Sequence, residues 1–237
     1  MSTVPLRGTA AKMSRVQRDP VDPKTLKQKL LFSTGLPRIP EDFRVEAQKL
    51  VENLTLQHSG GGGKAFAFTS SHPGEGVSTV CSSVMLAFGL SASGTSLYID
   101  ANFASPLAFS RSERSGFSDL LLGRCEVADS VDILEGMPIA LLGSGQATAE
   151  VATQASDEQI ASTFLELRSQ FNVIVVDLAP PLLCPFSNRI ARVLDGLALV
   201  VEAHKTDRLE IEMTVNSLRR AQVPLLGLVY NRRRFRA

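Results

Sequence analysis

The feature that most constrains the fold is a regular alternation of strand-like and helix-like segments between residues 65 and 231. Six short, mostly apolar runs are strand-like, at 65–68, 96–99, 139–142, 173–176, 198–201 and 225–230. Several of them are continuous enough to be buried on both faces of a sheet. Between them, apolar residues recur at helical spacing over 80–90, 160–167 and 211–218. Helices that alternate with strands serve as crossover connections, so the pattern predicts a parallel sheet between layers of helices.

The chain of 237 residues divides into three parts by composition. Residues 1–40 contain five prolines and eight basic residues against two acidic ones, which predicts a mostly extended basic arm. From residue 41 to about residue 58, Phe43, Ala47, Leu50 and Leu54 recur on one face, which predicts a helix at the start of a domain at 41–231. Residues 232–237 form a basic tail with four arginines.

The predicted domain is acidic, because residues 41–231 hold 13 basic and 22 acidic side chains. An acidic body with basic ends is unlike a nucleic-acid-binding protein, so we expect no nucleic-acid partner. The ends suit peripheral contact with an anionic membrane or an acidic partner, or they serve only as solvated tails. Three scattered cysteines and the absence of a long apolar run predict a reduced, cytoplasmic protein.

A glycine-rich segment, TSSHPGEGVST at residues 69–79, joins the first predicted strand to the next helix. Backbone N–H groups and the positive end of a helix converge on an anion at such a turn, so the segment predicts a phosphate-binding loop. The candidate nucleotide-binding residues of the loop are Gly74, Glu75, Gly76, Val77, Ser78 and Thr79. Ser78 stands where a loop hydroxyl ligates Mg²⁺, but Val77 stands where the pattern GxxxxGK[ST] requires lysine.

Two aspartates, Asp100 and Asp177, each lie at the carboxyl end of a predicted strand. Open parallel sheets bind ligands at this edge, so both carboxylates are expected close to the phosphate-binding loop. Together with Ser78 they are the candidate Mg²⁺ ligands, and they are also the candidate catalytic groups. The alternative is that they are ordinary carboxylates at strand ends.

Several segments resemble, in the same order, motifs of the bacterial tyrosine kinase (BY-kinase) family of capsule and exopolysaccharide synthesis. The loop is similar to TSxxPGEGKST, and LYIDANFASP at 97–106 is similar to LLIDADLRRP. GFSDLLLG at 116–123, FNVIVVDLAPP at 171–181 and GLVYN at 227–231 resemble GLSDLLLG, YDYVIIDTPP and GVVLN. The resemblance covers residues 41–231 and implies a P-loop NTPase-like α/β sandwich of three layers, with a mostly parallel central sheet flanked by helices. It also implies ATP or ADP with Mg²⁺ as ligands, and a place for Asn231 beside the adenine.

The chain departs from the family pattern at positions that carry its chemistry. Val77 replaces the loop lysine, Asn102 replaces the second aspartate of its motif, and Ala104 replaces an arginine. The tail holds no tyrosine cluster, and the two tyrosines of the chain, Tyr98 and Tyr230, lie in predicted strands. Autophosphorylation of a tyrosine-rich tail therefore has no substrate here.

Residues 41–47 resemble the ExxRxxR motif through which these kinases form rings, with Glu41 and Arg44 as its first two members. Ala47 replaces the final arginine, which puts ring assembly in doubt. Self-association and pairing with an intact kinase paralogue both stay open. The alternative is an ordinary amphipathic helix with surface charges.

Loss of one preorganised charge stabiliser costs roughly 10²–10³ in rate, so with lysine and aspartate both replaced we expect little phosphoryl transfer and weak or absent nucleotide binding. The sequence therefore favours a pseudokinase with a degenerate loop, a regulatory or scaffolding subunit that docks on the cytoplasmic segment of a membrane polysaccharide co-polymerase of the Wzz type. Two alternatives remain. One is an active ATPase or protein tyrosine kinase of the same pathway that uses a cation supplied by a partner, and the other is an accessory ATPase of the ParA or MinD kind.

Overall fold

The computed structural model describes residues 43–56, 63–90, 94–111, 114–134 and 137–232. The predicted arm at 1–40, Glu41 and the tail beyond Arg232 lie outside these residues. The helix predicted at 41–58 is present as α3, Phe43–Leu56, with Arg44 in its first turn. Its buried side chains, Ala47, Val51 and Leu54, follow the predicted helical spacing closely.

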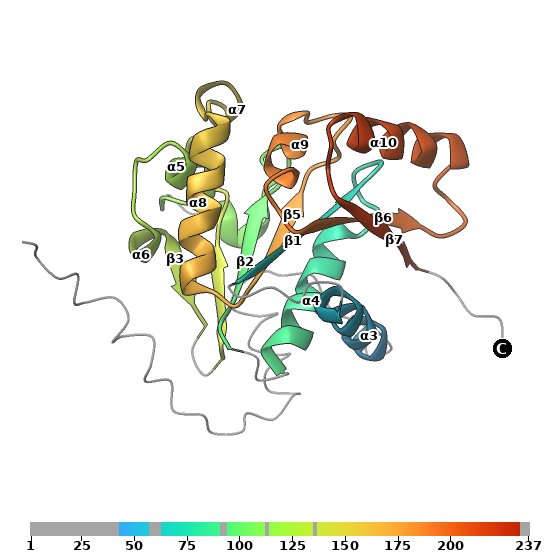
Figure 1. The fold of residues 1–237 in the computed structure, drawn as a ribbon, viewed down its shortest axis with the longest axis horizontal. Helices are drawn as coiled ribbons and strands as arrows, with labels where there is room; N and C mark the ends of the chain where they lie inside the picture. The colour runs from blue at the N-terminus through green and yellow to red at the C-terminus, as the bar shows by residue number, and fades with distance from the viewer. Residues whose placement is uncertain (1–42, 57–62, 91–93, 112–113, 135–136, 233–237) are drawn as a thin grey trace, which may run out of the picture.

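The seven strands of the described chain form one sheet (Figure 1). They are β1 Lys64–Ser70, β2 Ser96–Ala101, β3 Val131–Ile133, β4 Ile139–Leu142, β5 Val173–Leu178, β6 Gly196–Glu202 and β7 Leu225–Asn231. Their order across the sheet is β3-β4-β2-β5-β1-β6-β7, and every neighbouring pair is parallel except the antiparallel pair β3 and β4. The predicted parallel architecture is confirmed, and all six predicted strands are present.

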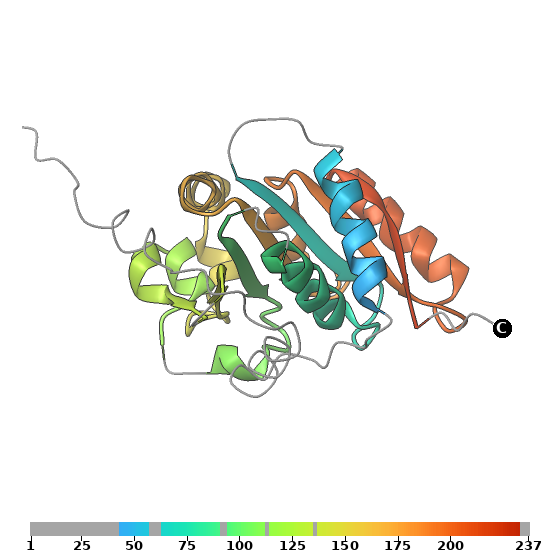
Figure 2. The ribbon, with the colours of Figure 1, turned by 90° about the horizontal axis from the view of Figure 1, so that it is seen from below.

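Helices cover both faces of the sheet, as Figures 1 and 2 show. After α3, they are α4 Val77–Leu90, α5 Phe117–Leu121, α6 Val127–Ser130, α7 Val151–Gln154, α8 Asp157–Gln170, α9 Phe186–Ala191 and α10 Arg208–Arg220, with a 3₁₀ turn η1 at Ala108–Arg111. The α3–α4 pair lies on one face, whereas α8, α9 and α10 lie on the other (Figures 1 and 2). The three predicted helical regions correspond to α4, α8 and α10.

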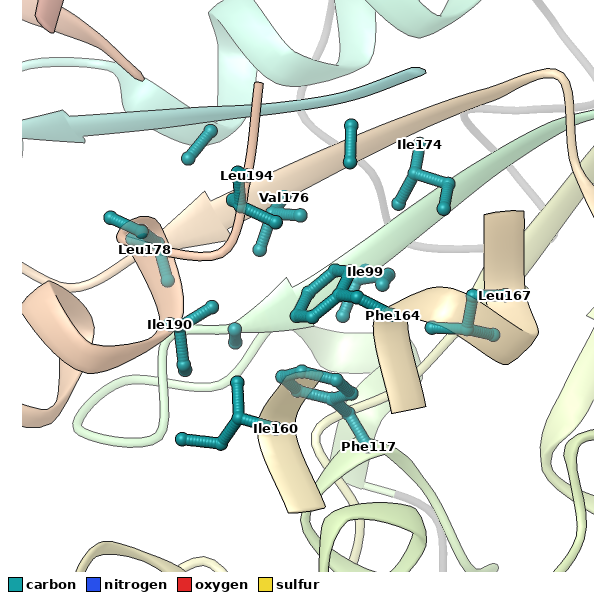
Figure 3. Close-up of a cluster of buried hydrophobic side chains, with 14 of the residues drawn as sticks. Ile99, Phe117, Ile160, Phe164, Leu167, Ile174, Val176, Leu178, Ile190 and Leu194 are labelled. Atoms are coloured by element: carbon teal, nitrogen blue, oxygen red, sulfur yellow. The ribbon is translucent and has the colours of Figure 1, made fainter. Parts of the chain in front are cut away.

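Each face of the sheet has its own apolar cluster, because the strand residues alternate between the two faces. On the α8 side, Ile99 and Val176 pack with Phe117, Ile160 and Phe164 (Figure 3). On the α4 side, the second cluster joins residues of α3 and α4 to the opposite face of the same strands. Burial on both faces explains why the central strands are continuous apolar runs.

Sequence patterning did not predict β3, the short edge strand at Val131–Ile133. The strand has three residues, all at least partly exposed, so it lacks the apolar run by which the other strands were found. It pairs antiparallel with β4, at the sheet edge farthest from β7. In the part of the chain that the structure describes, no helix has the length and apolar character needed to cross a membrane.

Candidate functional site

The glycine-rich loop lies at the carboxyl end of β1, directly before α4. Gly74 and Gly76 have φ angles of +88° and +94°, which side chains other than glycine rarely adopt. At Gly76 there is no space for a Cβ either, because it would lie 2.1 Å from Asn231 Nδ2, whereas Gly74 has open space around it. Both glycines are therefore required for conformation, and Gly76 also for close packing.

The backbone N–H groups of residues 74–79 donate no hydrogen bond to any atom of the described chain. The first hydrogen bond of α4 on this backbone runs from Val80 N to Gly76 O, at 3.0 Å. The loop therefore presents a row of free donors at the positive end of a 14-residue helix. Such an arrangement is suited to a phosphate group.

Glu75 holds the loop in this shape from inside. Its side chain is buried, and Oε2 accepts hydrogen bonds from Ser71 N at 2.8 Å and His72 N at 3.0 Å. Its other oxygen accepts a hydrogen bond from the Thr206 hydroxyl. Asn231 Nδ2 donates to the carbonyl oxygen of Glu75 at 2.7 Å. Glu75 therefore supports the loop, and the Asn231 amide contacts the loop backbone.

Two further contacts join the loop to α10. The Thr214 hydroxyl donates to Ser71 Oγ at 3.0 Å in a buried position, and His72 Nε2 lies 2.9 Å from Glu210 Oε1 at the surface. Together with the bond from Thr206 to Glu75, they connect the loop to the segment between β6 and the middle of α10. The conformation of the loop is thus coupled to the position of α10.

Asp100, at the end of β2, is buried and fully engaged by its neighbours. Its Oδ1 accepts from Asn102 N at 3.1 Å, and its Oδ2 accepts from Leu107 N at 2.7 Å and from Ser110 Oγ at 2.5 Å. Burial raises the pKa of this carboxyl, whereas the hydrogen bonds from Ser110, Leu107 and Asn102 lower it. Asp100 therefore organises the chain that follows β2.

Asp177 lies beside Asp100, because the two residues are register partners on β5 and β2. Its Oδ2 accepts a hydrogen bond from the Tyr98 hydroxyl at 2.9 Å, whereas its buried Oδ1 accepts none from the described chain. Burial and then the charge of Asp100 raise its pKa to about 7, against the opposing effects of the Ser78 and Tyr98 hydroxyls. Within the described chain, Asp177 thus has one oxygen that accepts a hydrogen bond and one oxygen that has no hydrogen-bond partner.

The positions that depart from the family pattern have structural roles of their own. Val77 packs against the apolar cluster on the α4 side, and Asn102 Oδ1 accepts from Ser105 N at 3.2 Å in the turn after β2. Among the described residues, no lysine or arginine forms an ion pair with Asp100 or Asp177. As far as the chain is described, the site therefore contains two buried carboxylates that are not paired with a cationic side chain.

A divalent cation would fit this site if the protein supplied only a few of its ligands. The described residues contain no cluster of three or more His, Cys, Asp and Glu side chains that could hold a metal by themselves. Mg²⁺ commonly binds one or two carboxylates together with phosphate oxygens and water. The unpartnered Oδ1 of Asp177 and the neighbouring Ser78 hydroxyl suit this role, whereas both oxygens of Asp100 already accept hydrogen bonds.

All predicted loop residues and both predicted aspartates lie at the carboxyl ends of adjacent strands, together with Asn231. Sequence reasoning missed the contacts that link this site to distant segments, those made by Tyr98, Thr206 and Thr214. Thr206 and Glu75 are 131 residues apart, and no spacing rule connects them. Lys64 begins β1, so it lies at the opposite end of that strand from the loop.

The fold and the site together define a protein of the P-loop NTPase-like α/β class. No protein-family model matches the chain. Tyrosine-protein kinase YwqD of Bacillus subtilis (strain 168) is 25% identical over 171 residues, which are 71% of this chain and 72% of that one. Tyrosine-protein kinase CpsD of Streptococcus agalactiae is 24% identical over 181 residues, which are 75% and 79%. In sequence and in fold, the chain is thus similar to bacterial tyrosine kinases.

Solved structures show the same similarity at the level of the fold. The kinase domain of VpsO superposes with a TM-score of 0.67 at 24% identity, over 81% of this chain and 96% of that one. Cobyrinic acid a,c-diamide synthase from Mycobacterium smegmatis, solved with a bound ATP analogue and magnesium, superposes with a TM-score of 0.59 at 14% identity, over 71% and 74%. The fold is thus shared with a protein that holds an ATP analogue and magnesium.

Proposed function

We propose that this chain is a pseudokinase-like regulatory or scaffolding subunit of exopolysaccharide or capsule biosynthesis and export. Its partner is the cytoplasmic segment of a membrane polysaccharide co-polymerase, which recruits it to the inner face of the plasma membrane. The observation that carries the proposal is a phosphate-binding loop with free N–H donors but with Val77 where a lysine would neutralise phosphate charge.

Electrostatics supports weak nucleotide binding without efficient phosphoryl transfer. Backbone donors and the helix dipole remain, and a magnesium–nucleotide complex would bring its own positive charge to Asp177. The charge that develops in the transition state, however, has no lysine to stabilise it, and one such stabiliser contributes roughly 10²–10³ in rate. Nucleotide binding then serves to set the conformation of the loop, and through it the position of α10.

The test compares Mg²⁺-ADP binding and Mg²⁺-ATP turnover of the full chain with those of Val77→Lys. We expect negligible turnover by the native protein and about tenfold or more tighter ADP binding by Val77→Lys, since hydrogen bonds to charged groups contribute about 1.5–3 kcal/mol. Val77→Met is the matched control, because it adds length without charge. Robust turnover by the native protein that Asp177→Asn abolishes would contradict the pseudokinase.

The partner is tested with vesicles that carry the co-polymerase cytoplasmic segment. We expect the full chain to bind such vesicles. We expect it not to bind vesicles that have the same lipids but lack the segment. Binding to both preparations would instead indicate direct attraction to anionic lipid. Binding to neither would contradict the proposed docking.

A second candidate function is an ATPase or tyrosine kinase that obtains its missing cation from a partner. The specific observation in its favour is the unpartnered Oδ1 of Asp177, which is available to a metal. It predicts that ATP turnover appears when the co-polymerase segment or an intact kinase paralogue is added. Turnover that stays at the background level in both mixtures would exclude this candidate for those partners.

A further inference from the structure

Tyr98 occupies an unusual place for a residue with a polar group. It is the largest fully buried side chain of the described residues, and its ring packs in the apolar cluster on the α4 side of the sheet. The edge of the ring meets Phe109, with centroids 5.9 Å apart and planes at 76°. The motif that residues 97–106 resemble has leucine at this position, so the fold itself does not require a hydroxyl here.

The hydroxyl of this buried ring reaches the candidate metal site. It donates to Asp177 Oδ2 at 2.9 Å. In the sheet register Tyr98 pairs with Val175, which precedes Asp177 by two residues. Two residues of a strand span about 6.6 Å on the same face, a distance that a tyrosine covers and a serine or threonine does not. Tyrosine is thus suited to carry a donor from position 98 to this carboxylate.

This hydrogen bond gives the two carboxylate oxygens of Asp177 different surroundings. Oδ2 is fixed by a ring that cannot move within a packed core, so rotation of the carboxylate is restricted. Oδ1 is left buried and without a partner in the described chain.

A purely structural role of Tyr98 would not require this particular acceptor for its hydroxyl. A buried hydroxyl must be satisfied, and any acceptor would serve that purpose. Here the acceptor is a carboxylate whose other oxygen has no hydrogen-bond partner among the described residues, and the Ser78 hydroxyl of the loop lies near it. Asp100, at the adjacent strand end, shows the opposite arrangement, since both of its oxygens accept hydrogen bonds.

We propose that Tyr98 is a positioning residue for divalent-cation binding, which holds Asp177 Oδ2 so that Oδ1 faces the cation of a bound magnesium nucleotide. Tyr98 itself touches neither the cation nor the nucleotide. This inference rests on the proposed nucleotide binding and identifies the residue that makes Asp177 an effective metal ligand in this chain.

The experiment measures ADP affinity of the full chain by calorimetry, once in EDTA and once in saturating Mg²⁺. The ratio of the two affinities reports the contribution of the cation. Tyr98→Phe removes only the hydroxyl, and we expect it to lower this ratio by about tenfold, as other residues that orient a metal ligand do, while affinity in EDTA stays unchanged. Tyr230→Phe is the matched control, because Tyr230 is exposed on β7. If Tyr98→Phe does not fold, Tyr98→Leu is the second variant, with the side chain of the related motif.

The outcomes separate this inference from the proposed function. A ratio that is normal in Tyr98→Phe but lost in Asp177→Asn would overturn the role of Tyr98 and leave the metal site intact. If Tyr98→Phe weakens ADP binding equally in EDTA and in Mg²⁺, Tyr98 has only a structural role, and this result also overturns the inference. A native protein whose ADP affinity does not respond to Mg²⁺, or that binds no ADP, would overturn both the inference and the proposed metal–nucleotide binding.

Discussion

Removal of the charge at Asp177 should change how the stability of the protein depends on pH. Asp177 is fully buried, and its pKa in the folded protein is raised from 3.8 to about 7, by burial first and by the charge of Asp100 second. Between these two values the folded protein keeps the proton that the unfolded chain releases. The folded state therefore binds more protons, and its free energy of unfolding falls as the pH rises from about 4 to about 7.

The magnitude follows from the shift of about three pKa units at 1.36 kcal/mol each. Relative to a neutral side chain, ionisation of Asp177 destabilises the fold by about 2 kcal/mol at pH 5 and about 4 kcal/mol at pH 7. Asp177→Asn is close to the protonated carboxyl in shape and never ionises. Between pH 5 and pH 7, the free energy of unfolding of the native protein should therefore fall by about 2 kcal/mol more than that of the variant.

Urea unfolding followed by far-ultraviolet circular dichroism at pH 5, 6 and 7, without Mg²⁺ or nucleotide, measures this difference. Because every other titrating group is common to both proteins, the comparison isolates Asp177. Asp129→Asn, at an exposed position in α6, is the matched control and should follow the native protein. Parallel pH dependence of the native protein and Asp177→Asn would refute the reasoning, since it would mean that folded Asp177 is already ionised at pH 5.

Two further predictions concern the loop. Gly76→Ala should lower the free energy of unfolding by about 1–3 kcal/mol and weaken ADP binding in calorimetry, because its methyl group would meet Asn231 and its φ is positive. Gly74→Ala also has a positive φ but has open space around it, so it should lower the free energy of unfolding by only about 1 kcal/mol. Glu75→Gln should cost about 1–3 kcal/mol in urea unfolding and speed proteolysis of the loop, because an amide cannot accept on both sides as the carboxylate does. Equal stabilities of the two glycine variants, or an unchanged Glu75→Gln protein, would contradict these assignments.

Much of the fold could be predicted because its decisive patterns are local. Strands buried on both faces are continuous apolar runs, and alternation with helical spacing is enough to specify crossovers and a parallel sheet. The loop was also visible, since Gly74 and Gly76 mark a turn that only glycine forms easily. The short strand at Val131–Ile133 carried no such pattern, because none of its side chains is fully buried.

The site was predictable in composition but not in its division of roles. The sequence places Asp100 and Asp177 at equivalent strand ends, and nothing in their spacing distinguishes them. The difference arises from partners: the chain after β2 turns back so that Leu107 and Ser110 reach Asp100, whereas Asp177 receives its donor from Tyr98 on a neighbouring strand. Such contacts depend on three-dimensional packing and leave no periodic trace in one sequence.

The absence of a lysine in the loop and the raised pKa of Asp177 are two aspects of one electrostatic balance. Two buried carboxylates side by side are costly when both are charged, and a cation or a proton must compensate for them. With Val77 at the loop position, no lysine or arginine of the described chain forms an ion pair with either aspartate, so a proton on Asp177 takes that role near neutral pH. A divalent cation and this proton would compete for the same oxygens. We therefore expect that, with valine instead of lysine at position 77, nucleotide binding depends more strongly on a divalent cation.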